Sequence, residues 1–306
     1  MLIIGVDSGG TKTEAVLIGD DGLMAEALAG PSNPASVGID IACSNIKEAL
    51  GKLGGVEPDA VGLGVAGLVD ARLASELGRC LELRNPVFFE DIEAAHVSAF
   101  LFSEGVVGVL GTGSSFLGVK GSAKIRIGGW GHLFGDEGGA YHIGREAIRM
   151  ALREAEQMEE RGCLADDVFR FYGAGGVGEL LYIIYSSSSP RNKIAEYAPR
   201  VFALARSCRD ALEVVRSAAD SVAEYIATVF RRLGRLPVAL TGSVYLNNEE
   251  MLRPMIESAL ARLGHRVEIK RPLVKQSCAA ALIAARALGL LDERLIERVR
   301  ETCPLK

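Results

Sequence analysis

The chain has 306 residues, of which 34 are basic and 39 acidic, so its formal net charge is −5. Charges mixed in this way exclude the concentrated basic face of a nucleic-acid-binding protein. The 36 glycines come with only 10 prolines and no Gly-X-Y period, which excludes collagen and Gly/Pro-rich disorder. The longest charge-free apolar run, residues 105–119, is too short to cross a bilayer. We therefore expect a cytoplasmic protein of two domains, with no nucleic-acid or membrane partner.

The first third of the chain alternates between strand and helix patterns. Glycine turns separate three short apolar runs at its start, which predicts a β-meander followed by alternating helices and strands. The expected strands are 2–7, 12–18, 23–28, 60–66 and 86–90, and the expected helices are 41–53, 72–83 and 91–102.

The opening pattern then recurs about 103 residues later. Residues 3–6 and the glycine turn 9–11 correspond to residues 106–109 and the glycine turn 111–113. A second strand follows each turn. The repeat favours a duplicated architecture, and the alternative is a chance similarity between two apolar hairpins.

The second half of the chain is mostly helical, and the whole pattern predicts an α/β protein with two lobes. We expect helices over 136–157, 163–172, 177–185, 191–206, 210–234, 249–263, 276–288 and 292–301, with strands at 236–241 and 266–269.

The cysteines show no pairing pattern. They lie far apart, without a C-x-x-C motif, so we expect reduced thiols. The six are Cys43, Cys80, Cys163, Cys208, Cys278 and Cys303.

Two glycine turns that follow strands are candidate phosphate sites. A turn over 9–12 follows the carboxylate of Asp7, and a second over 111–114 adds hydroxyl groups. Glycine lets backbone N–H groups approach a phosphate closely. Neither turn matches the Walker A pattern, and each alone is equally explained as a plain hairpin turn. Together they predict a clamp on the phosphates of a nucleotide.

Three further segments could carry chemistry. Asp91 follows a strand at the start of a helix, where it is either a helix cap or a catalytic carboxylate. The segment 128–139 combines six glycines with Trp130 and the Asp136-Glu137 pair, which suits contact with a polyol, although an irregular loop is the simpler alternative. The turn 242–244 could hold a ribose or base, or be only a strand–helix loop.

Taken in order, these segments resemble the N-acetylglucosamine kinase branch of the sugar-kinase/actin/Hsp70 ATPase superfamily. Related members of that superfamily are the BadF/BadG-type ATPases and small archaeal hexokinases. The resemblance rests on residues 5–13, 32–33, 64–67, 91, 111–114, 129–138 and 242–244. It implies two RNase H-like lobes with a central cleft, one formed by 1–103 with 289–306 and the other by 104–288.

The resemblance also implies roles for single residues. Asp7 would bind Mg²⁺ through water, and Asp91 would act as general base on the attacking hydroxyl. The residues expected to bind ATP are Gly9, Gly10, Thr11, Lys12, Thr112, Gly113, Gly242, Ser243 and Val244. Those expected to bind the sugar are Asn33, Ser114, Gly129, Trp130 and Asp136.

The implied activity is an ATP- and Mg²⁺-dependent sugar kinase acting at the 6-hydroxyl, with a homodimer as a candidate assembly. N-acetylglucosamine is the first expected substrate, and glucose and glucosamine follow. Ser115, Pro34 and Gly139 depart from the kinase pattern, and the first two lie near the implied sugar pocket. The alternatives are a BadF-type ATPase that activates a dehydratase or reductase, and a sugar-sensing regulator without catalysis.

Overall fold

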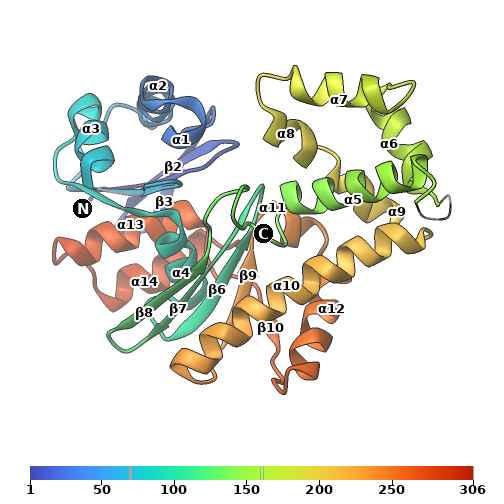
Figure 1. Cartoon of the computed structure of the whole chain (residues 1–306). Helices are drawn as coiled ribbons and strands as arrows, with labels where there is room; N and C mark the ends of the chain where they lie inside the picture. The colour runs from blue at the N-terminus through green and yellow to red at the C-terminus, as the bar shows by residue number, and fades with distance from the viewer. Residues whose placement is uncertain (69–70, 159, 161, 306) are drawn as a thin grey trace. The chain divides into compact units, whose positions relative to one another are not determined.

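The computed structural model describes residues 1–68, 71–158, 160 and 162–305. The chain divides into two compact units, each built on one five-stranded sheet. Unit 1 comprises Met1–Val107 and Arg271–Lys306, and unit 2 comprises Gly108–Lys270. Figure 1 follows the elements along the chain. In the described residues, none of the helices combines the length and the apolar character that a bilayer crossing requires.

The sheet of unit 1 has the strand order β3-β2-β1-β4-β5. The three N-terminal strands form the predicted antiparallel meander, whereas β4 and β5 run parallel to β1. Their bounds are β1 (Ile3–Ser8), β2 (Thr13–Gly19), β3 (Gly22–Ala29), β4 (Ala60–Val65) and β5 (Pro86–Glu90). Ser8 pairs with Val65, which in turn pairs with Glu90, so the carboxyl ends of the parallel strands meet at one edge.

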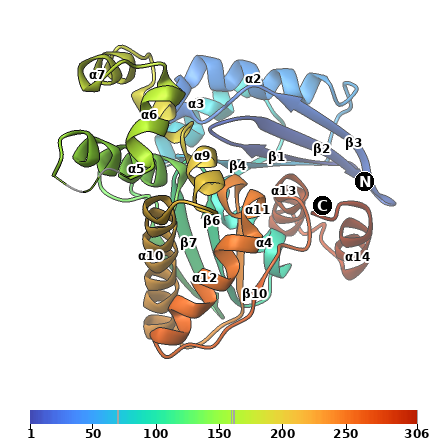
Figure 2. The same cartoon turned by 90° about the vertical axis from the view of Figure 1, so that its right-hand side faces the viewer.

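Helices cover both faces of this sheet, as Figure 2 shows for α2 and α3 on one side and α13 and α14 on the other. Side chains alternate along a strand, so Ile4 and Val6 of β1 pack toward α2 and α3, and Ile3 packs toward α13 and α14. The helices are α1 (Pro34–Val37), α2 (Ile39–Gly51), α3 (Ala71–Leu81), α4 (Asp91–Phe100), α13 (Gln276–Ala287) and α14 (Glu293–Thr302).

Helix α13 belongs to unit 1, whereas the predicted lobe boundary placed residues up to 288 in the other lobe. The helix is rich in alanine and lies unusually close to the sheet. A Cβ at Gly5 would collide with the carbonyl of Ser277, and one at Gly62 with the carbonyl of Ala280. These sheet glycines therefore provide the room that the helix needs.

The sheet of unit 2 has the order β10-β9-β6-β7-β8, which repeats the order of unit 1 when both are read from the β5 or β10 end. This agreement confirms the duplicated two-sheet α/β architecture. The strands are β6 (Gly105–Leu110), β7 (Ser114–Lys120), β8 (Ala123–Gly128), β9 (Val238–Thr241) and β10 (Ile269–Lys270).

The helices of unit 2 differ from prediction in three places, one of which is the short helix α11 (Ser243–Asn247), which was not expected. The segment 136–139 is a turn, so the helix expected from residue 136 begins at Ala140. The helix expected over 191–206 is two helices, because Pro199 stands in the first turn of the second. The bounds are α5 (Ala140–Ala155), α6 (Leu164–Tyr172), α7 (Val177–Tyr185), α8 (Pro190–Ala195), α9 (Ala198–Leu204), α10 (Arg209–Leu233), α11 (Ser243–Asn247) and α12 (Glu249–Arg262).

The expectation of reduced thiols is wrong, because all six cysteines form disulfides. The pairs are Cys43–Cys80, Cys163–Cys208 and Cys278–Cys303, with Cα–Cα distances of 6.4, 6.2 and 6.6 Å, inside the usual range. Partners lie 25 to 45 residues apart in the sequence, so only the packing of helices brings them together.

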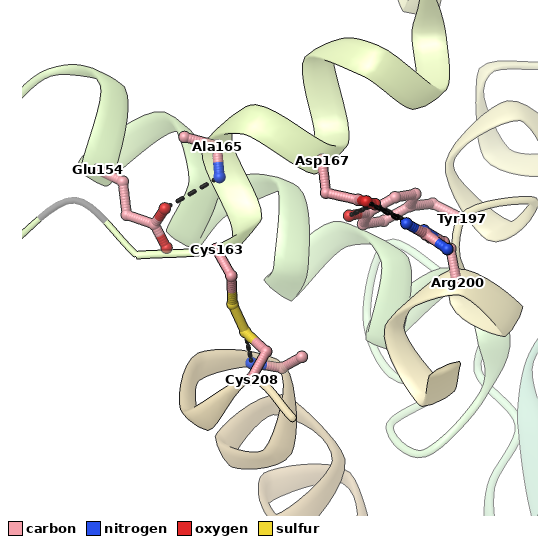
Figure 3. The surroundings of a disulfide bond; sticks show 8 residues. Glu154, Cys163, Ala165, Asp167, Tyr197, Arg200 and Cys208 are labelled. Atoms are coloured by element: carbon pink, nitrogen blue, oxygen red, sulfur yellow. Dashed lines mark hydrogen bonds and ion pairs between the residues drawn. A yellow bond between two sulfur atoms is a disulfide. The ribbon is translucent and has the colours of Figure 1, made fainter. Parts of the chain in front are cut away.

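The surroundings of the Cys163–Cys208 bond show how the helices of unit 2 are tied to one another (Figure 3). The disulfide links the residue before α6 to the N-cap of α10. Beside it, Asp167 of α6 accepts hydrogen bonds from Tyr197 (3.0 Å) and from Arg200 of α9. Burial acts to raise the pKa of Asp167, but the bonds from Arg200 and Tyr197 lower it overall. The ion pair thus stays intact at neutral pH.

Candidate active site

Two carboxylates lie at the edge where the parallel strands of unit 1 end. Asp7 is the second-last residue of β1, and Asp91 opens α4 directly after β5. The Asp91 Oδ1 atom accepts a hydrogen bond of 2.9 Å from the backbone N–H of Ile92. Glu90, not Asp91, is the N-cap of α4, so the carboxylate of Asp91 projects from the first turn of the helix.

The electrostatics of Asp7 identify this edge as a candidate cation site. The pKa of Asp7 is raised to about 7, most strongly by burial and then by the negative charges of Asp91 and Glu14, whereas Lys12 opposes the shift. A divalent cation beside the pair would relieve both the burial and the repulsion. Carboxylate oxygens are the protein ligands that Mg²⁺ prefers, so the residues here fit the ion that the sequence predicts at Asp7.

The first glycine turn is closed by its own backbone and anchors a distant segment. The N–H of Gly9 donates to the carbonyl of Lys12 (3.0 Å). The carbonyl of Gly9 accepts from the N–H groups of Ser32 (3.0 Å) and Asn33 (3.2 Å). Gly10 and Thr11 at the tip are exposed. The turn predicted to bind phosphate and the residue predicted to bind sugar are therefore held together in unit 1.

A buried hydroxyl cluster, which the sequence analysis did not identify, holds this turn in place. The side-chain oxygen of Ser8 donates to the carbonyl of Ser32 (2.9 Å), and that of Thr13 donates to the carbonyl of Gly30 (2.6 Å). The hydroxyl of Ser32 bonds to both side chains. In the sequence, its only sign is that Ser8 and Thr13 flank the glycine turn.

Lys12 and Asn33 already have protein partners. The ammonium of Lys12 lies 2.8 Å from Glu14 Oε2, and its side chain is 57% exposed. Burial acts to raise the pKa of Glu14, but the bond from Lys12 and the charge of Lys275 lower it overall. Asn33 caps α1 by accepting from the N–H of Ala35 (2.9 Å). Lys12 would therefore have to leave Glu14 to reach a phosphate.

The second glycine turn packs on the start of α5 in unit 2. The N–H of Gly111 donates to the carbonyl of Gly113 (2.9 Å), and the first N–H groups of α5 donate back to the turn. Ala140 bonds to Gly111 (2.9 Å) and Tyr141 to Thr112 (3.0 Å). The predicted phosphate turn and the carboxylate-bearing segment before α5 therefore form one structure.

Two glycines make this contact possible. A Cβ at Gly113 would overlap the carboxylate of Asp136, and a Cβ at Gly139 would lie 2.6 Å from the Gly113 backbone. The hydroxyl of Ser114 also donates to the carbonyl of Glu137 (2.6 Å). The predicted ATP residue Gly113 and the predicted sugar residues Ser114 and Asp136 are thus neighbours.

The third turn joins the same group. Gly242, the N-cap of α11, has a φ of 92°, and a Cβ there would collide with the backbone of Leu110. Only glycine accommodates both constraints. Ser243 and Val244, which open α11, therefore lie next to the strand that leads into Gly111, so the structure brings the ATP-binding residues predicted in unit 2 together.

The segment before α5 presents Trp130 to solvent. Its side chain is 66% exposed, and the Arg126 guanidinium lies 5.8 Å from the ring centre. Gly129 and Gly131 on either side have φ values of 73° and 82°, which only glycine adopts without strain. An exposed aromatic face held by a constrained backbone suits stacking against a sugar ring.

Asp136 is held by Arg191, a residue that the sequence analysis missed. Asp136 is only 4% exposed and has a φ of 68°, which is uncommon for a residue other than glycine. The Nη2 atom of Arg191, in α8, lies 3.3 Å from its Oδ2 atom. The adjacent Glu137 accepts a hydrogen bond from Tyr225, whose pKa is raised by burial and by that carboxylate. No local spacing links Asp136 to an arginine 55 residues away.

Comparisons with known proteins identify relatives of this chain. The chain is 33% identical over 205 residues to the N-acetylmuramic acid/N-acetylglucosamine kinase of Clostridium acetobutylicum, covering 63% of this chain and 67% of that protein. It is 25% identical over 315 residues to the N-acetyl-D-glucosamine kinase of Dictyostelium discoideum, covering 92% and 97%.

Solved structures show the same fold. The crystal structure of a candidate N-acetylglucosamine kinase from Chromobacterium violaceum has a TM-score of 0.80 at 24% identity, covering 92% of this chain and 98% of that one. The model of the BadF/BadG/BcrA/BcrD ATPase family matches residues 4–284. Because this match spans nearly the whole chain, the protein belongs to the BadF/BadG/BcrA/BcrD ATPase family.

Proposed function

We propose that the protein is an ATP-dependent kinase that phosphorylates an amino sugar or hexose at its 6-hydroxyl, with N-acetylglucosamine as the first candidate. The observation that carries the proposal is the carboxylate pair Asp7–Asp91 beside a glycine turn, at the carboxyl ends of the parallel strands of unit 1. The names of the relatives support the choice of an amino sugar.

In this proposal each carboxylate has a separate task. Bound Mg²⁺ would neutralise charge on the phosphates, and Asp7 would hold it through water. Asp91 would accept the proton of the attacking hydroxyl, since its Oδ1 atom is oriented by the N–H of Ile92. Backbone N–H groups of Gly10, Thr11, Thr112 and Gly113 would bind phosphate oxygens.

The remaining candidate residues divide between the ATP site and the sugar site. Gly9, Lys12 and the 242–244 turn would complete the ATP site. Asn33, Ser114, Gly129, Trp130 and Asp136 would bind the sugar. In this scheme the protein supplies positioning and charge stabilisation, which is most of what phosphoryl transfer requires.

The pairing of the cysteines argues against the reductase-activator alternative. Such activators hold an iron–sulfur cluster with cysteine thiolates from two subunits, and clusters of this kind need thiolate ligands. All six cysteines of this chain, each in the described part, are paired in intrachain disulfides.

A coupled ADP-release assay tests the proposal across N-acetylglucosamine, glucosamine, glucose, mannose and N-acetylmannosamine. We expect ADP release that requires one of the amino sugars. No sugar-dependent release with any of the five would contradict the proposal. The homodimer and the cytoplasmic location stay predictions. Sedimentation of the same preparation tests the first, and fractionation of the source cells tests the second.

A further inference from the structure

The guanidinium of Arg191 has a donor that the protein leaves unused. Its Nη2 atom faces Asp136, but its buried Nε–H has no hydrogen-bond partner among the described residues. The Arg191 side chain as a whole is 29% exposed, whereas its Nε atom is buried, so a ligand reaches this donor only if the side chain shifts. A buried donor without an acceptor costs free energy, so an acceptor brought by a ligand would complete the arrangement.

The neighbouring groups restrict what this ligand can be. Asp136 balances the charge of Arg191, and Asp136 itself packs on Gly113. Burial lowers the pKa of His132, and the charge of Arg191 lowers it further against the opposing effect of Asp136. His132 is therefore neutral at neutral pH, and Arg191 provides the positive charge at this place.

A guanidinium can donate hydrogen bonds but cannot accept them. The matching group on an amino sugar is the carbonyl oxygen of an N-acyl substituent, which can only accept. A free ammonium can only donate, so it would leave the Nε–H unpaired and add a like charge. A sugar hydroxyl can also accept a hydrogen bond, but its own O–H then needs a separate acceptor.

We propose that Arg191 is a specificity residue of the sugar site, whose Nε–H donates a hydrogen bond to the N-acyl carbonyl oxygen of the substrate. The inference rests on the proposed function, in which Asp136 binds the sugar. Asp136 would accept a hydrogen from a sugar hydroxyl while Arg191 donates to the acyl group, so the ion pair offers one acceptor and one donor side by side.

The test compares Arg191→Lys and Arg191→Gln with the wild type on N-acetylglucosamine and glucosamine. Lysine keeps a positive charge for Asp136 but has no counterpart of the Nε–H. We expect both variants to lose about 10- to 100-fold in kcat/KM for N-acetylglucosamine, as one hydrogen bond to a charged group would give. The KM for ATP should stay within about twofold, and the preference for the acetylated sugar should fall at least about tenfold.

Arg209→Gln is the matched control. Arg209 lies on α10 with 87% of its side chain exposed and pairs with Glu213, so its loss should leave both sugars unaffected. Circular dichroism and thermal melts check that each variant folds.

The outcomes distinguish failure of the inference about Arg191 from failure of the proposed kinase function. Full activity on N-acetylglucosamine in Arg191→Lys would show that charge alone is needed and would overturn the inference. A wild-type enzyme that prefers glucosamine would overturn it as well, even if the variants failed to fold. A wild type that phosphorylates none of the sugars would instead refute the proposed function, and the inference with it.

Discussion

Asp91 contributes directly to the raised pKa of Asp7, although 83 residues separate the two in sequence. Two carboxylates that repel one another at a strand edge cost stability unless a cation neutralises them. Under the proposed function, this relationship predicts that activity depends on pH and on Mg²⁺.

Binding of Mg·ATP should weaken as the pH falls from 8 to 6. Because the pKa of Asp7 is about 7, its carboxyl group becomes protonated in this range and can no longer hold the cation. The measurement is kcat/KM for Mg·ATP against pH at saturating sugar. Asp7→Asn should have low activity and lack the step near pH 7. A wild-type profile that is flat between pH 6 and 8 would contradict the assignment.

Asp7→Asn should also make the metal-free protein more stable at pH 8. The folded-state pKa of about 7 exceeds the ordinary aspartate value of 3.8, so the folded chain binds more protons than the unfolded chain between these values. The free energy of unfolding of the wild type therefore falls as the pH rises from 4 to 7, by at most about 4 kcal/mol. Urea unfolding at pH 4 and pH 8 in EDTA measures this loss. The variant should show a smaller difference between the two pH values, and an equal difference would refute the account.

Gly113→Ala should destabilise unit 2 by about 1 to 3 kcal/mol, because the new methyl group overlaps the carboxylate of Asp136. Gly111→Ala is its matched control, since a Cβ there has no atom within 4 Å. Thermal unfolding of the two variants compares them directly. If both variants melted at the wild-type temperature, the packing of Asp136 on the glycine turn would be wrong.

The three disulfides predict a chain without free thiols. Unfolding in guanidinium without reductant should expose no thiol to Ellman's reagent, and reduction should release six. Loss of one bond, for example in Cys163→Ser with Cys208→Ser, should cost about 2 to 4 kcal/mol. Six reactive thiols in the freshly unfolded protein would contradict the pairing.

Local sequence patterns predicted the duplicated sheets correctly, because a strand, a glycine turn and a second strand form a short-range signal. Local patterns also singled out Asp7, near the end of β1, and Asp91, directly after β5. The pairing of β1 with β4 and of β4 with β5 then brings them to one edge.

Contacts between distant segments were not predictable in this way. The helix α13 joins unit 1 because its alanines fit over Gly5 and Gly62, and nothing near residue 276 indicates this. Arg191 and the cysteine partners likewise meet their neighbours only through the packing of helices. Their roles depend on tertiary structure and not on local periodicity.

The measurement that tests the central claim most directly is ADP release by the wild type and by Asp91→Asn, with and without N-acetylglucosamine. We expect the wild type to release ADP only when the sugar is present. Asp91→Asn should lose about 100-fold or more in kcat while its affinity for ATP changes by less than about twofold. Sugar-independent ADP release by the wild type, or full activity of Asp91→Asn, would contradict the account.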